Sequence, residues 1–156
     1  MKVARVEAPD GRVLALAAVP VVQFNLTEAL RHASRGARTR QDAVADMYSR
    51  DDGTWGLSDP VKELDLVSDL AAAVLFAYAA IEGLGDQALE RLDRRGRAWR
   101  KLAHLTELHR ELVRPRAGSD GLAIFGRLMR GDADSCADDA VEVVSALRPD
   151  LLPAAE

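Results

Sequence analysis

The sequence has little of several things that would place it in a specialised protein class. Its 156 residues include one cysteine, Cys136, so no disulfide can form within the chain, and a cytoplasmic setting is expected. The longest apolar run, Leu70 to Ile81, has 12 residues, fewer than the roughly 20 that span a bilayer. The N-terminus lacks the charged-then-apolar layout of a signal peptide.

Glycine and proline are also limited, at 11 and 6 residues, which excludes collagen-like and low-complexity chains. With 48% hydrophobic and 29% charged residues, the composition is that of a folded globular protein. A length of 156 residues is within the usual range of one domain. The composition therefore predicts one folded domain.

The motifs of familiar enzymes are missing as well. The chain has no Gly-Lys-Ser phosphate loop, no nucleophile elbow and no pair of cysteines. Gly83, Gly85 and Ala88 match a loose dinucleotide fingerprint, but they fall late in a predicted helix, without the strand that this motif needs. His104 and His109 are about 140° apart around a helix, and no Glu-x-x-His motif is present, so no metal or other cofactor is expected.

Lysine is scarce, because only three of the 21 basic residues are lysine and the rest are arginine. The net charge is −4 and the pI is near 5.4, so any contact with nucleic acid must be local. The arginines form two clusters, Arg31, Arg35, Arg38 and Arg40, and Arg91, Arg94, Arg95, Arg97 and Arg100. These clusters are either solvated helix faces or a surface that meets phosphate.

The chain begins with a predicted β hairpin followed by a helical region. Lys2 to Val6 and Arg12 to Val22 are extended-looking apolar segments around an Asp-Gly turn signal. We assign residues 1–24 to this hairpin and residues 25–152 to a helical domain. The first helix is expected to begin after Asn25, as an N-cap, and to run toward Tyr48 with Gly36 as a weak point.

The remaining helices follow from start and stop signals. Asp51 to Gly56 reads as a loop, after which Ser58 or Asp59 caps a helix with Pro60 in its first turn, reaching about Leu92. This helix is predicted to be the core of the fold, because its apolar residues follow the three-and-four spacing of one buried face: Leu64, Val67, Leu70, Val74, Tyr78, Ile81 and Leu84. Further helices are expected over Ala98–Arg114, over Asp120–Arg130 with Ser119 as cap, and from Asp132 or Asp134 to near Pro149. The expected fold is all-α, with four to five helices and the hairpin in front.

Two segments carry a family resemblance, Ala77-Tyr78-Ala79-Ala80-Ile81-Glu82-Gly83-Leu84 and His109-Arg110-Glu111-Leu112-Val113-Arg114-Pro115-Arg116. With them the chain resembles the HEPN superfamily of helical domains, over roughly residues 59–147. Many members have an alanine-rich helix with a glutamate, followed by a segment reading roughly Arg-Asn-x-Leu-Val-His-Pro. The resemblance implies a HEPN-like helical bundle.

The match to that second segment is incomplete at its signature positions. Leu112, Val113 and Pro115 fall into the family frame, but His109 occupies the family's Arg position, Arg110 its Asn position and Arg114 its His position. The two signature residues are thus exchanged. HEPN ribonucleases work without a metal, with histidine moving a proton and arginine stabilising charge on phosphate near a dimer groove.

The resemblance implies a set of site residues. His109 and Arg114 are the catalytic candidates, and Arg110, Arg116 and Glu82 are binding candidates. Arg97 and His104 also fit the family's loose pattern of an arginine followed by a histidine. They lie outside the segment that matches the family proline at Pro115, and they complete the set of binding candidates.

Each candidate also has a structural interpretation. His109 borders the apolar face of its helix, Arg114 and Arg116 complement a helix C-terminus, and Glu82 is expected to be buried and paired with an arginine. Tyr78 and Trp99 are expected in the core or an interface, and Cys136 is expected to be a small buried side chain.

Three functions remain open. The first is a HEPN-like domain that has lost catalysis and binds RNA, a nucleotide or a protein in its groove. The second is a metal-independent endoribonuclease of toxin type with an antitoxin partner. The third is a helical protein-interaction module without a nucleic-acid role. A homodimer is expected, because the long apolar helix has more surface than its shorter neighbours cover.

Overall fold

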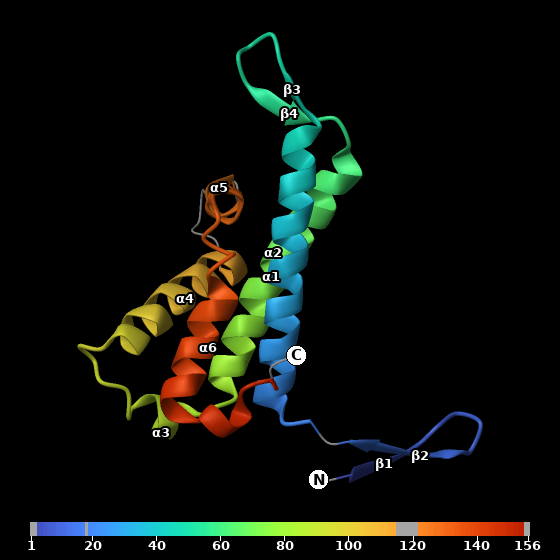
Figure 1. Cartoon of the computed structure of the whole chain (residues 1–156), viewed down its shortest axis with the longest axis vertical. Coiled ribbons are helices and arrows are strands. Elements are labelled where there is room, and N and C mark those ends of the chain that lie inside the picture. The colour runs from blue at the N-terminus through green and yellow to red at the C-terminus, as the bar shows by residue number, and fades with distance from the viewer. Residues whose placement is uncertain (1–2, 18, 115–121, 155–156) are drawn as a thin grey trace.

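The computed structural model describes residues 3–17, 19–114 and 122–154 (Figure 1). The chain is mostly helical, at 64%, with a two-stranded hairpin at its N-terminal end, which confirms the predicted coarse architecture. The described residues form six helices rather than the expected four to five, because the long helix predicted from Pro60 to about Leu92 is interrupted at Gly85. The described residues form β1 (Val3–Glu7), β2 (Val13–Ala17), α1 (Val21–Ala45), β3 (Met47–Ser49), β4 (Trp55–Leu57), α2 (Pro60–Glu82), α3 (Asp86–Leu89), α4 (Arg97–Val113), α5 (Leu122–Arg130), α6 (Cys136–Leu147) and a 3-10 turn, η1 (Pro149–Leu151).

The core lies around α2, as the sequence predicted. Figure 1 shows α1 and α2 side by side as a long antiparallel pair, with α4 and α6 against one end of it. Leu70, Val74 and Ile81 of α2 are fully buried between these helices. Leu64, expected on the same buried face, is instead 67% exposed, because it lies at the end of α2 that α4 and α6 do not reach.

In length and composition, α2 is also the one helix among the described residues that could cross a membrane. A core helix satisfies the same criterion, and α2 packs against α1, α4 and α6. Its apolar character is therefore explained by the core.

The start of α2 is the predicted one, but its end is not. The Asp59 carboxylate accepts a hydrogen bond from the Val61 N–H at 2.9 Å, and Pro60 opens the helix. The helix ends at Glu82 rather than near Leu92. Gly85 has φ +81°, a conformation that favours glycine and interrupts the helix before the short α3.

The first helix begins before the predicted position. It starts at Val21, and Asn25 is a buried residue inside it rather than its N-cap. Val22 and Leu26 are buried one turn apart against α2, so packing of the Val22 side chain extends the helix toward Pro20. The helix also continues through Gly36, the predicted weak point.

The segment predicted as a loop after α1 contains a second hairpin. Met47, Tyr48 and Ser49 pair with Leu57, Gly56 and Trp55 in an antiparallel register. The Asp52 carboxylate accepts hydrogen bonds from the N–H and hydroxyl of Thr54, and Gly53 has φ +80°. The Asp52-Gly53 pair is the same turn signal that marked the first hairpin.

The later helices agree with the sequence more closely. Helix α4 matches its prediction to within one residue at each end, and α5 ends at Arg130 before Gly131, which has φ +103°. The predicted start of that helix at Ser119 and Asp120 lies outside the described residues. The last helix begins at Cys136, later than Asp132 or Asp134, with Ser135 as its N-cap.

Cys136 is fully buried, as predicted, and its thiol donates a hydrogen bond to the Asp132 carbonyl oxygen at 3.2 Å. Burial raises the pKa of this thiol to about 12.

Because Cys136 is buried and its thiol is hard to ionise, we expect a thiol reagent to modify it only after the protein unfolds. Measuring labelling against denaturant concentration tests this. Rapid labelling of the native protein would contradict this expectation. A peptide with a free thiol serves as the control for the activity of the reagent.

Candidate functional site

His109, the central candidate of the sequence analysis, lies on the side of α4 that faces α2. Its ring stacks on that of Tyr78, with ring centroids 3.7 Å apart and an angle of 11° between the planes. Burial lowers the pKa of His109, and the nearby charge of Glu82 partly opposes that effect. The imidazole is half-buried and has one face covered.

Next to this stacked pair, α2, α3 and α4 enclose a groove of about 650 Å³, which we call the α2–α4 groove. Its apolar lining includes Tyr78, Ile81, Leu89, Trp99 and Leu102. Its charged lining residues are Glu82, Asp86, Glu107 and Arg110. The groove thus combines apolar side chains with three carboxylates and one guanidinium.

Glu82 lies in this groove but does not have the expected environment. The sequence placed it inside a buried helix, where it would need an arginine partner. In the structure it is exposed, because α2 ends at this residue. Among the ion pairs of the described residues, none joins Glu82 to an arginine. Its exposure removes the penalty that made such a partner necessary.

Arg110 and Arg114 lie at the C-terminal end of α4. Arg110 lines the α2–α4 groove, whereas Arg114 is the exposed C-cap, and its N–H bonds to the Arg110 carbonyl at 2.9 Å. Both positions suit the negative end of the helix dipole. Arg116 lies outside the described residues.

Arg97 and His104 face a different neighbour, the helix α6. Arg97 Nη2 lies 2.8 Å from Glu142 Oε1, and His104 Nδ1 lies 3.2 Å from Asp139 Oδ2. Lys101 Nζ lies 2.9 Å from the other oxygen of Asp139, which is 2% exposed. These contacts connect α4 to α6, and the structure does not bring Arg97 or His104 into the α2–α4 groove.

A second buried carboxylate was not anticipated from the sequence. Asp69 of α2 is buried, and its Oδ1 lies 2.8 Å from His32 Nδ1 and 3.6 Å from Arg35 Nη2 on α1. The His32 ring also stacks on Phe76. The only sequence signal was an acidic residue directly before the longest apolar run, and nothing in the sequence indicated its partners on α1.

Among the described residues, no group of three or more His, Cys, Asp or Glu side chains is placed to hold a metal ion. No protein-family model, curated protein or solved structure matches this chain.

Proposed function

We propose that this chain is a HEPN-like helical domain that has lost catalysis and binds a partner protein through the α2–α4 groove. The observation that carries the proposal is the lining of this groove, in which Glu82, Asp86 and Glu107 outnumber Arg110 and accompany apolar side chains. A positively charged amphipathic helix of the partner fits this chemistry, with its apolar side chains on the apolar lining and its lysine or arginine side chains near the carboxylates. The single cysteine fits a cytoplasmic role.

The same lining argues against RNA cleavage in this groove. Three carboxylates repel the phosphate backbone that a ribonuclease must hold. Arg114 is the C-cap of α4 and has left the helical conformation, so the helix does not hold it in a fixed register with His109. Stacking of His109 on Tyr78 is explained as packing between α2 and α4.

Trp99 provides a direct test, because it lines the groove. In a Trp55→Phe background it is the only tryptophan. We expect a helical peptide of leucine and lysine to change its fluorescence, and a peptide of leucine and glutamate to leave it unchanged. Combining Glu82→Gln with Glu107→Gln should weaken binding about tenfold, since each exposed charge pair contributes up to about 1 kcal/mol.

The matched control is Glu63→Gln with Asp65→Asn, two exposed carboxylates at the opposite end of α2. This variant should bind the cationic peptide as the parent does. If both double variants bound the cationic peptide equally weakly, the binding would come from general charge attraction and not from the α2–α4 groove. Cleavage of an RNA pool in EDTA that disappears in His109→Ala would overturn the proposal in favour of a metal-independent ribonuclease.

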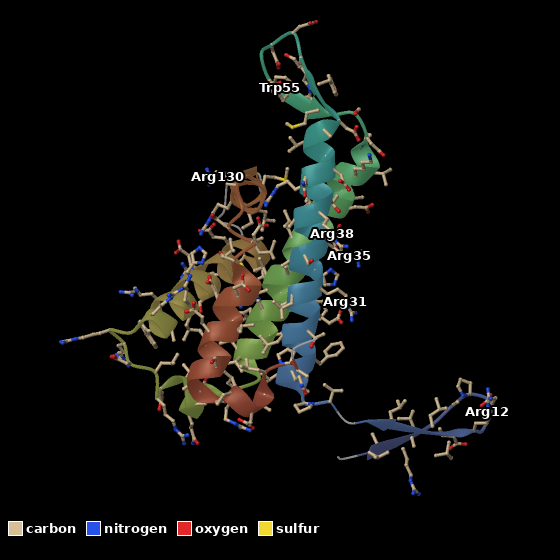
Figure 2. The ribbon with its side chains drawn as sticks, viewed as in Figure 1. Arg12, Arg31, Arg35, Arg38, Trp55 and Arg130 are labelled. Atoms are coloured by element: carbon tan, nitrogen blue, oxygen red, sulfur yellow. The ribbon has the colours of Figure 1, made fainter. Side chains whose placement is uncertain are left out.

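RNA binding without cleavage is a second candidate, favoured by the arginines of α1. Arg31, Arg35 and Arg38 recur at helical spacing, and Figure 2 shows them following one another along α1. Two of these arginines lie near carboxylates, however. Glu28 Oε1 is 2.7 Å from Arg31 Nη1, and Asp69 Oδ1 is 3.6 Å from Arg35 Nη2. Salt-dependent RNA binding that Arg31→Ala and Arg38→Ala weaken would support this candidate.

A further inference from the structure

One face of the N-terminal hairpin is entirely apolar. In the register of β1 and β2, Ala4 pairs with Leu16 and Val6 pairs with Leu14. Because side chains alternate between the two faces of a strand, these four residues share one face, which we call the hairpin face. The opposite face carries Arg5 and Glu7 and is mixed in character. The hairpin is therefore amphipathic.

Among the residues that the structure describes, none covers the hairpin face. All four of its side chains are exposed, and Figure 1 shows the hairpin projecting away from the helices. A two-stranded hairpin is marginally stable in water unless an apolar face packs against something else. The exposed face thus indicates a surface that another element covers.

A second uncovered apolar surface lies at the other end of the α1–α2 pair. A groove of about 730 Å³, which we call the distal groove, is lined there by residues of α1, α2 and the hairpin β3–β4. Its apolar lining includes Val44, Met47, Trp55, Leu64 and Met129. Trp55 and Leu64 are 63% and 67% exposed. Exposed apolar patches rimmed by polar residues, here Arg40, Arg50 and Glu63, are typical of protein interfaces.

The hairpin of the same chain cannot cover the distal groove. The chain runs from Ala17 at the end of β2 to Val21 at the start of α1. The middle of the hairpin face lies half a strand beyond this connection. Fully extended, the connection and that half of β2 together span about 22 Å. Helix α1 has 25 residues and is about 37 Å long, and the groove is at its far end. The hairpin face therefore needs a second molecule to reach such a groove.

We propose that two copies of this chain exchange hairpins, so that the hairpin face of each packs in the distal groove of the other. The two surfaces lie at opposite ends of α1, so a twofold axis that places the two α1 helices antiparallel satisfies both contacts at once. This inference does not depend on the α2–α4 groove or on the proposed function.

The size of the surfaces also favours exchange over direct pairing of two hairpins. A standard interface buries roughly 800 Å² on each partner, much more than four side chains of one hairpin supply. In the exchanged dimer each copy contributes both a hairpin face and a groove. Pairing of two hairpins would also leave Trp55 and Leu64 exposed.

The proposal is tested by measuring the dimer dissociation constant by sedimentation, for the full chain and for two single variants. These are Leu14→Lys on the hairpin face and Leu64→Glu in the distal groove. We expect a dimer for the parent and a dissociation constant raised about 100-fold or more for each variant, since each change affects both contacts. Both residues are exposed, so circular dichroism should show unchanged helicity. Leu75→Lys, at an exposed apolar site in the middle of α2, should leave the dimer intact.

Mixing the two variants gives the sharpest result. A mixed dimer has one unaltered contact and one contact in which lysine meets glutamate, so the mixture should dimerise although neither variant does alone. In a Trp99→Phe background, Trp55 emission should shift to the blue as the parent dimerises. A monomeric parent, a dimer that only Leu14→Lys disrupts, or a dimer that Leu75→Lys disrupts would each overturn hairpin exchange.

Discussion

Replacing Gly36 by valine is expected to destabilise the protein by about 3 kcal/mol, the upper end of the usual cost of overpacking a core. A Cβ atom at Gly36 would lie 2.7 Å from Leu70 Cδ2 and 3.3 Å from Leu70 Cγ. Leu70 is fully buried, so its side chain can move aside only by displacing other core residues. Thermal unfolding should show a midpoint about 6–12 °C lower. The glycine that looked like a weak point in α1 thus permits its close approach to α2.

A double-mutant cycle separates this steric effect from helix propensity. Gly36→Ala gains about 1 kcal/mol of helix propensity but meets the same Leu70 side chain. Adding Leu70→Val removes the Cδ atoms, so the pair should cost less than the sum of the single changes. Gly126→Ala is the matched control, because no described atom lies within 4 Å of its added Cβ, and it should be neutral or stabilising. Additive costs at Gly36 and Leu70 would rule out the close contact.

Replacing Asp139 by alanine is the second change with a large expected effect, a loss of about 3 kcal/mol. The carboxylate is 2% exposed and lies 2.9 Å from Lys101 Nζ and 3.2 Å from His104 Nδ1. Its removal leaves two cationic or polar groups of α4 facing an apolar part of α6. Denaturant unfolding, with the free energy extrapolated to water, measures the loss.

Two comparisons identify the origin of that loss. Asp138→Ala removes an exposed carboxylate in the same first turn of α6, and it should cost only the helix-dipole contribution of about 0.5 kcal/mol. The triple change Asp139→Leu, Lys101→Met and His104→Leu removes the whole group and should be much less costly than Asp139→Ala alone. Similar losses for Asp138→Ala and Asp139→Ala would contradict a buried ionic contact.

The features of the fold that follow from local chemistry could be predicted from the sequence. Asp59 and Pro60 define the start of α2 through a cap and a fixed φ, and the Asp-Gly turn defines the first hairpin. The start of α1 could not be predicted in this way, because it depends on a distant contact. Val22 Cγ2 lies 2.9 Å from the position of a Cβ built on Gly83, so the start of α1 packs against the end of α2.

The candidate site was predicted less well, for the same reason. The separation of His104 from His109 around α4 followed from helix geometry, and the two side chains do contact different helices. The burial of Glu82 was wrong, because it assumed a helix continuing to Leu92. The charge of the α2–α4 groove depends on Asp86 of α3 and Glu107 of α4, which are brought together only by the tertiary fold. The exchanged HEPN signature remains a prediction.

The position of α6 has a consequence for synthesis on the ribosome. Helices α1 and α2 are close in sequence and can associate early, but α6 packs against α1, α2 and α4 and follows all of them in the chain. At about 5–20 residues per second, the nascent chain therefore waits several seconds with the α6-facing side of α2 uncovered. Chaperones should bind preferentially to stalled chains that end before Cys136, and those chains should be degraded faster than completed ones.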